Sequence, residues 1–191
     1  MKKLNKVVMV IAKICEVAHW FFTAFCFIAL MIMIFNPQIL IAINSQDQSK
    51  SLHDLQTGSF SISPYLNDGS FSVTAVIIFC ITAVIMLSLT AMVFRNVYLI
   101  CRTANGKTKF SQGSTMFQKD ITRMVREIGI FLISGNIIGN IVCVIALAVL
   151  GWENIEVSMG NQTLFIGLII LYLSSVFDYG YKLQKDVDGL L

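Results

Sequence analysis

Residues 73–94 read VTAVIIFCITAVIMLSLTAMVF, without a single charged side chain. A helix rises about 1.5 Å per residue, so roughly 20 apolar residues cross the ~30 Å hydrocarbon core of a bilayer. This stretch is therefore predicted to be a transmembrane helix.

Three further apolar stretches flank it, and the composition of the whole chain agrees with them. Of its 191 residues, 56% are hydrophobic and 13% are charged, with a mean hydropathy of +0.76. Soluble domains carry about 25% charged residues, and none of the stretches alternates polar with apolar residues as barrel strands do. We expect a single all-α membrane domain over residues 1–191, an antiparallel four-helix bundle. Its predicted parts are spans at about 14–43, 71–101, 124–151 and 162–182, an outer loop at 44–70 and an inner loop at 102–123.

The charges predict the orientation of this bundle. Of the 14 basic residues, 13 fall on one side of the predicted spans and only Lys50 on the other. The positive-inside rule then places both termini and the inner loop in the cytoplasm. The basic face is interpreted as serving orientation and anionic lipid contact rather than nucleic-acid binding. The 13 residues are Lys2, Lys3, Lys6, Lys13, Arg95, Arg102, Lys107, Lys109, Lys119, Arg123, Arg126, Lys182 and Lys185.

The outer loop is longer than a connection between neighbouring helices requires, because links in helical bundles usually have 2–8 residues. Within it, Phe60 and Ile62 alternate with serines, which predicts a short strand packed over the mouth of the bundle. Two interpretations of the loop stay open. It is either a flexible surface segment or a contact site for an external peptide ligand.

Polar residues within apolar spans are the first candidates for function. Five such residues fall near the inner ends of their spans: Glu16, His19, Arg95, Arg126 and Asp178. We expect them to form one intramembrane polar network, in which the two carboxylates meet the two arginines. A structural ion-pair lock and a proton or ion relay are the two interpretations. An enzyme acting on lipid-soluble substrates would instead need an acid–base pair among Glu16, His19 and Arg95.

A second polar pattern lies in the middle of the third span. Gly135 and Gly139 form a GxxxG motif, and Asn136 and Asn140 stand one turn apart beside it. Small residues let helices approach closely, and asparagine amides form hydrogen bonds between helices. Tight packing within one chain, a homodimer seam and an asparagine-lined ligand site all remain open.

The sequence carries no recognisable enzyme, cofactor or metal motif. Haem between helices usually needs two axial histidines, but of the two histidines only His19 lies in a predicted span and His53 lies in the outer loop, and zinc motifs are absent. No cysteine pair forms a CxxC, so a thiol oxidoreductase is disfavoured and the cysteines are expected to be reduced and to serve packing. They are Cys15, Cys26, Cys80, Cys101 and Cys143.

Two stretches resemble a family of small bacterial four-helix membrane proteins of unknown function. One is Lys109-Phe110-Ser111 followed by Arg123-Met124-Val125-Arg126-Glu127-Ile128-Gly129, at the entry to the third span. The other runs from Val176 to the C-terminal Leu191. Genes of that family often stand beside one for an Xre/Cro-type helix-turn-helix regulator. The resemblance implies the four-span fold and this genomic association, but no activity.

Together these patterns predict a non-enzymatic accessory membrane protein. It would sense or resist a membrane-active agent, or signal to a cytoplasmic regulator, with the outer loop receiving and the basic inner loop and tail transmitting. The alternative is a small transporter or channel subunit that acts as an oligomer, since four helices alone rarely enclose a pore.

Overall fold

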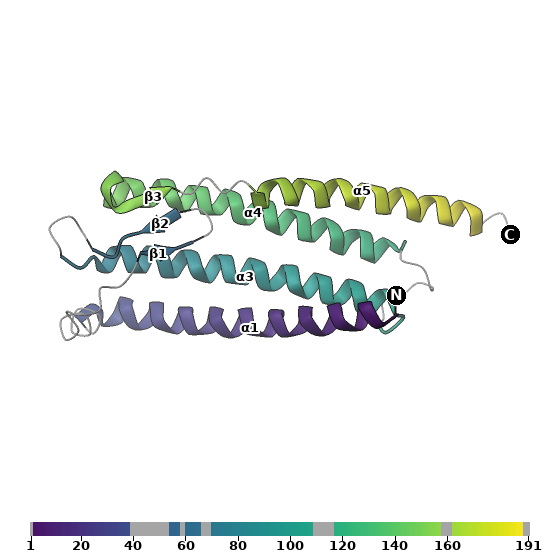
Figure 1. The fold of residues 1–191 in the computed structure, drawn as a ribbon, viewed down its shortest axis with the longest axis horizontal. Coiled ribbons are helices and arrows are strands. Elements are labelled where there is room, and N and C mark those ends of the chain that lie inside the picture. Colours follow the sequence, from purple (N-terminus) through teal and green to yellow (C-terminus); the bar gives the residue numbers. More distant parts are fainter. Residues whose placement is uncertain are drawn as a thin grey trace. The chain divides into compact units, whose positions relative to one another are not determined.

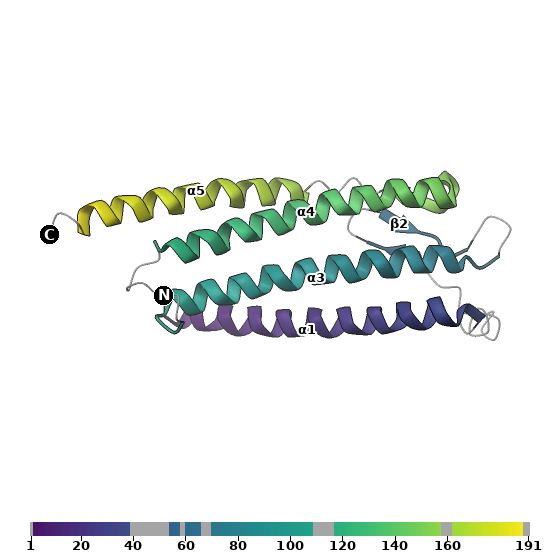
Figure 2. The ribbon, with the colours of Figure 1, turned by 180° about the vertical axis from the view of Figure 1, so that it is seen from behind.

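Four long helices form most of the chain in a computed structural model, shown from two sides in Figures 1 and 2. They are α1 (Lys2–Phe35), α3 (Val73–Ala104), α4 (Lys119–Leu150) and α5 (Gln162–Asp188). Within the described residues, all four are long and apolar enough to cross a membrane. The prediction of an all-α chain with four such helices is confirmed. The structure describes residues 2–38, 54–57, 60–65, 70–108, 117–157 and 162–188.

Several helices extend beyond the spans predicted from apolar residues alone. α4 begins at Lys119, five positions ahead of the predicted span, and α5 continues to Asp188. Side-chain pairs one turn apart stabilise such charged ends. Arg123 Nε lies 3.2 Å from Glu127 Oε1 in α4, and Lys182 Nζ lies 2.8 Å from Asp178 Oδ2 in α5. A prediction that counts only apolar residues therefore ends before these charged helical turns.

The first helix is interrupted within its predicted span of 14–43. α1 ends at Phe35, Asn36 breaks the helix, and residues 37–38 are helical again. The Asn36 amide still donates to the carbonyl oxygen of Ile32, at 2.8 Å. Pro37 has no amide hydrogen, and its ring disfavours helical geometry at the preceding residue, so the regular ladder stops here. Residues 39–43 lie outside the described residues.

Contacts group the chain into two compact units, and each is described by itself. The sheet unit comprises Trp20–Ser88 and Gly135–Asn161, and the polar unit comprises Met1–His19, Leu89–Ser134 and Gln162–Leu191. α1, α3 and α4 each contribute residues to both units. Every described lysine and arginine belongs to the polar unit.

A small antiparallel sheet distinguishes the sheet unit. It has the order β1 (Leu55–Gln56), β2 (Phe60–Ile62) and β3 (Ile155–Val157), and the short 3₁₀ helix η1 (Trp152–Asn154) precedes β3. Ser61 pairs with Gln56 on one side and with Glu156 on the other. The sheet therefore joins the segment before α3 to the segment after α4.

The predicted strand at Phe60–Ile62 is confirmed, and its alternation explains its packing. Successive side chains of a strand point to opposite faces, so Phe60 and Ile62 share the face opposite Ser61. Both are completely buried. They form a core cluster with Ala75 of α3, Cys143 and Ala146 of α4 and Ile155 of β3.

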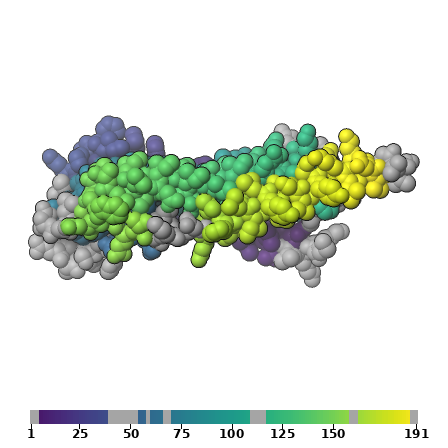
Figure 3. Space-filling view, turned by 90° about the horizontal axis from the view of Figure 1, so that it is seen from above, coloured from purple at the N-terminus to yellow at the C-terminus, as the bar shows by residue number. Residues whose placement is uncertain are grey.

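The polar unit depends on close contacts between α4 and α5. A Cβ atom added to Gly167 would lie 2.7 Å from Cγ1 of Ile133, closer than packed atoms approach. Phe117, just before α4, packs against Phe177 in a tilted arrangement with ring centroids 5.7 Å apart, and a Cβ on Gly180 would meet the Phe117 ring at 2.6 Å. In the space-filling view the teal part of α4 lies beside the yellow α5 (Figure 3).

Candidate functional site

The polar residues predicted to form one network lie in the polar unit, where the structure shows several local pairings. Glu16 is buried, with 8% of its surface exposed, and its Oε2 lies 3.0 Å from Nζ of Lys13 on the same helix. The Lys13 ammonium also stands 5.1 Å from the ring centroid of Tyr98 in α3. The lysine thus balances the Glu16 charge and links α1 to α3 by a cation–π contact.

His19 is half-buried on the same helix. Its Nδ1 lies 2.7 Å from the carbonyl oxygen of Cys15. Because a carbonyl can only accept, Nδ1 carries the hydrogen and donates it. The imidazole also packs against Phe94 of α3, with ring centroids 5.2 Å apart. These contacts orient the ring.

A cavity of about 440 Å³ lies between α3 and α4 and holds a charged cluster. The carboxylate of Glu127, on α4, accepts the hydrogen bonds of this cluster. Its Oε1 pairs with Nε of Arg123, and its Oε2 accepts a hydrogen bond from Nδ2 of the buried Asn96, at 3.1 Å. Arg95 lines the same cavity and makes no ion pair or side-chain hydrogen bond within the described part of the chain.

The other two predicted residues, Arg126 and Asp178, meet at a second cavity of about 220 Å³ between α4 and α5. Hydroxyl groups of Thr122, Ser174 and Ser175 complete its lining. Asp178 forms its ion pair with Lys182 of its own helix. The two predicted residues therefore share a cavity, whereas a single network that includes Glu16 and Arg95 stays a prediction.

Asn96 was missing from the predicted site, although the structure places its amide at the centre of the α3–α4 cluster. Its signal was present, since an asparagine directly follows Arg95 in an otherwise apolar span. Glu127 and Arg123 are visible in the sequence as charged residues, but only the fold shows that Asn96 bonds to Glu127 from another helix.

Asn136 and Asn140 bond to each other along α4. Nδ2 of Asn140 donates to Oδ1 of Asn136 at 3.2 Å, and Asn136 is buried whereas Asn140 is exposed. Gly139 of the predicted GxxxG is also buried. This contact satisfies part of the amides' hydrogen-bonding capacity within one helix, and a role of this face in a homodimer stays a prediction.

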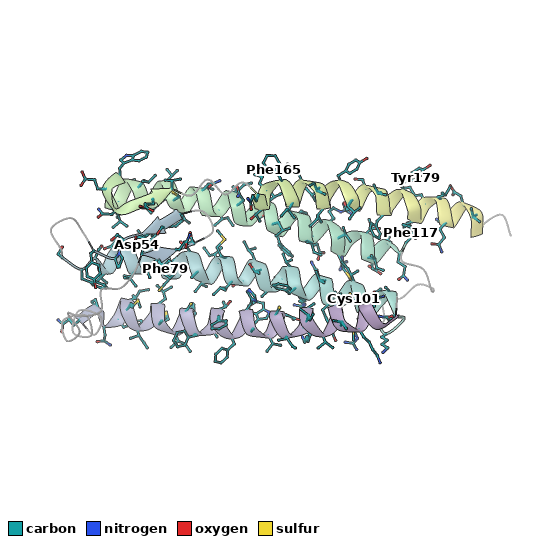
Figure 4. The ribbon with its side chains drawn as sticks, in the orientation of Figure 1. Asp54, Phe79, Cys101, Phe117, Phe165 and Tyr179 are labelled. Carbon is teal, nitrogen blue, oxygen red and sulfur yellow. The ribbon has the colours of Figure 1, made fainter. Side chains whose placement is uncertain are left out.

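The sheet unit contains a different kind of cavity, of about 360 Å³. Apolar side chains of α1 and α3 form most of its wall, and strand β1 and the residue after it supply the polar groups, Gln56 and Thr57. Thr57 is held in place, because its hydroxyl donates to the carbonyl oxygen of Phe60 at 2.9 Å. The Gln56 side chain is exposed and makes no hydrogen bond within the described part of the chain. The apolar lining is Phe22, Cys26, Phe79, Ala83, Met86 and Leu87, of which Phe79 is labelled in Figure 4.

The five cysteines all carry free thiols, as expected. Two of them pack in apolar clusters, Cys143 with Phe60 and Cys80 with Leu30 and Val76. Across the described ranges, no group of three or more histidines, cysteines or carboxylates is arranged to hold a metal ion.

Comparisons with protein-family models, with curated proteins and with solved structures found no match for this chain. Functional inference therefore starts from the two features that the geometry singles out. These are the apolar cavity beneath β1 and the charged cavity between α3 and α4.

Proposed function

We propose that this chain is a non-enzymatic, multi-pass protein of the bacterial cytoplasmic membrane that senses or resists a membrane-active, amphipathic agent. The cavity beneath β1 carries the proposal. Its volume of about 360 Å³ lies within the range of small-molecule sites, and its polar groups come from strand β1 and the residue after it, while its apolar wall comes from two helices. Such an arrangement suits a ligand with a polar end and an apolar chain.

A lipid bilayer is the first partner of such a protein. Large apolar side chains are exposed along the helices, among them Phe21 at 71%, Tyr172 at 74% and Phe165 at 62%. Figure 4 shows Phe165 and Tyr179 projecting outward from α5. In water this surface would be costly, at about 25 cal/mol per Å², whereas acyl chains can cover it at no such cost.

The distribution of charge supports an orientation with both termini in the cytoplasm. All described lysines and arginines belong to the polar unit, whereas the sheet unit carries the acidic Asp54, Glu153 and Glu156. By the positive-inside rule the polar unit lies on the cytoplasmic side. Contacts from Phe117 to Phe177 and from Gly129 to Gly167 support an antiparallel course of α4 and α5, since one residue number rises as the other falls.

The cytoplasmic partner in this proposal is a regulator of the Xre/Cro helix-turn-helix type, which the resemblance to the small bacterial family suggests. The exposed charged end of α5, including Lys182 and Lys185, is the surface we assign to it. An external peptide would enter at the sheet, so ligand binding would belong to the sheet unit and signalling to the polar unit.

A binding measurement tests the proposal. The probe is a dansyl-labelled acylated cationic peptide, titrated into the protein in phosphatidylcholine nanodiscs. Ala83→Phe should fill the cavity and weaken binding about tenfold, whereas Ala148→Phe, on an exposed position of α4, should leave binding unchanged. Cells lacking the gene should also be more sensitive to membrane-active peptides. Equal binding by both variants, together with unchanged sensitivity across a panel of such peptides, would refute the proposal.

The Asn136–Asn140 pair favours a second candidate, a transporter or channel subunit. A buried asparagine joined to an exposed one places polar groups on a helix face that a homo-oligomer could enclose. Ion or dye flux in proteoliposomes that disappears with Asn136→Leu but persists with Ser88→Leu would favour this candidate. Absence of flux with the wild-type chain would count against it.

A further inference from the structure

The charged cavity between α3 and α4 has more positive than negative charge on its lining. Arg95 and Arg123 contribute two guanidinium groups, and Glu127 contributes the single carboxylate. Both oxygens of that carboxylate are already engaged, Oε1 by Arg123 and Oε2 by Asn96. The Arg95 guanidinium forms no ion pair or hydrogen bond with Glu127 or with any other side chain in the described part of the chain.

An unpaired guanidinium within an apolar helix is costly in a membrane, and such residues normally meet a partner. Arg95 follows the uncharged run from Val73 to Phe94, and its side chain remains exposed at the cavity. A guanidinium offers a planar fork of donors that matches the oxygens of a phosphate group in a bidentate manner. A phosphate is thus a partner that satisfies both its charge and its geometry.

The remainder of the lining indicates which phosphate compound fits. Met92 and Leu99 of α3 and Met124 and Phe131 of α4 give the cavity apolar walls beside the arginines. A volume of about 440 Å³ exceeds what a phosphate alone needs. Basic pockets between membrane helices are known binding places for anionic lipid head groups.

We propose that this cavity is a binding site for the phosphate of an anionic phospholipid, with Arg95 as its main ligand. Arg123 lies near the bound phosphate while it pairs with Glu127, and the apolar walls contact the glycerol and upper acyl carbons. The cavity of Arg126 differs in the charge of its described lining, which carries one arginine and one carboxylate, Asp178. This inference does not depend on the peptide-binding function proposed above, which concerns a different cavity.

Native mass spectrometry of the detergent-solubilised protein tests the site, with phosphatidylglycerol and phosphatidylcholine as probes. Wild type should retain phosphatidylglycerol, and Arg95→Gln should reduce the bound fraction about tenfold, as expected for loss of charge-assisted hydrogen bonds. Arg102→Gln is the matched control. It removes the same charge from the same helix, where the side chain bonds to the Tyr98 hydroxyl and the Lys107 carbonyl instead. It should leave retention unchanged.

Two further arms make the outcome decisive. Arg95→Lys keeps the charge but loses the bidentate fork. Its retention of phosphatidylglycerol should therefore lie between that of wild type and that of Arg95→Gln. This variant also tests the site if the glutamine variant does not fold. Inorganic phosphate at millimolar concentration should not displace the lipid; full displacement would identify soluble phosphate as the ligand and overturn the lipid assignment. Equal losses of bound lipid in the Arg95 and Arg102 variants would show that net charge alone drives retention. No loss in either variant would show that Arg95 does not bind the lipid. Either result would overturn the proposal.

Discussion

The backbones of Gly129 and Gly167 touch where α4 meets α5: a Cβ atom added to Gly129 would lie 2.9 Å from the carbonyl oxygen of Gly167. The same Cβ would lie 2.8 Å from Cγ of Leu171. A backbone oxygen cannot move aside as a flexible side chain can. The contact therefore requires glycine at position 129, in the way that small residues generally set the distance between membrane helices.

Gly129→Ala is expected to destabilise the chain by about 1–3 kcal/mol, because overpacking forces the two helices apart. Thermal unfolding in phosphatidylcholine nanodiscs measures this loss. Ile130→Ala, one residue further on and 46% exposed, is the control and should change the unfolding midpoint little. If the two substitutions had equal effects, the close contact would not be important for stability.

Phe60→Ala should destabilise the sheet unit by about 3–5 kcal/mol, as expected for loss of a completely buried phenylalanine. Cys143 packs in the same cluster, so its thiol should react faster with a maleimide in this variant, which peptide mapping can measure. Ser61→Ala, on the opposite face of β2, should leave both stability and the Cys143 reaction rate near the wild-type values. An unchanged rate in Phe60→Ala would mean that the sheet does not cover this part of α4.

Glu127→Gln removes the only negative charge among the described residues that line the α3–α4 cavity. Two arginines then lack a carboxylate, so the unfolding midpoint in phosphatidylcholine nanodiscs should fall. Phosphatidylglycerol should raise the midpoint of this variant more than that of wild type, because the cavity has become more positive. Glu156→Gln, at an exposed position of strand β3, should show the wild-type difference between the two lipids. A smaller lipid effect in Glu127→Gln than in wild type would contradict the proposed site.

The proposed orientation predicts which introduced cysteines an impermeant maleimide can reach in intact cells. Glu153→Cys lies in η1 of the sheet unit and should be labelled from outside. Asn105→Cys lies in the turn after α3 and should be labelled only after the membrane is permeabilised. The wild-type chain, with its five native cysteines, provides the blank. The reverse pattern would invert the orientation.

Individual residues show how far sequence-based prediction reached. The alternation at Phe60 and Ile62 was enough to predict β2, because a strand with one buried face has a visible period of two. Strand β3 was not predicted, since the three residues Ile155–Val157 form a strand only by pairing with β2. Similarly, Gly129 could be recognised as a small residue, but nothing in the sequence paired it with Gly167.

The sequence alone predicts four long apolar helices, which the structure confirms, and its charge pattern predicts that 13 of the 14 basic residues lie on one side of a membrane. Both predictions rest on local composition, because hydropathy and charge are counted along continuous segments. Which polar groups meet depends on how the helices pack. Asn96 and Glu127 are 31 positions apart, yet the Asn96 amide donates to the Glu127 carboxylate. Such contacts arise between separate helices, where packing rather than sequence spacing sets the distances.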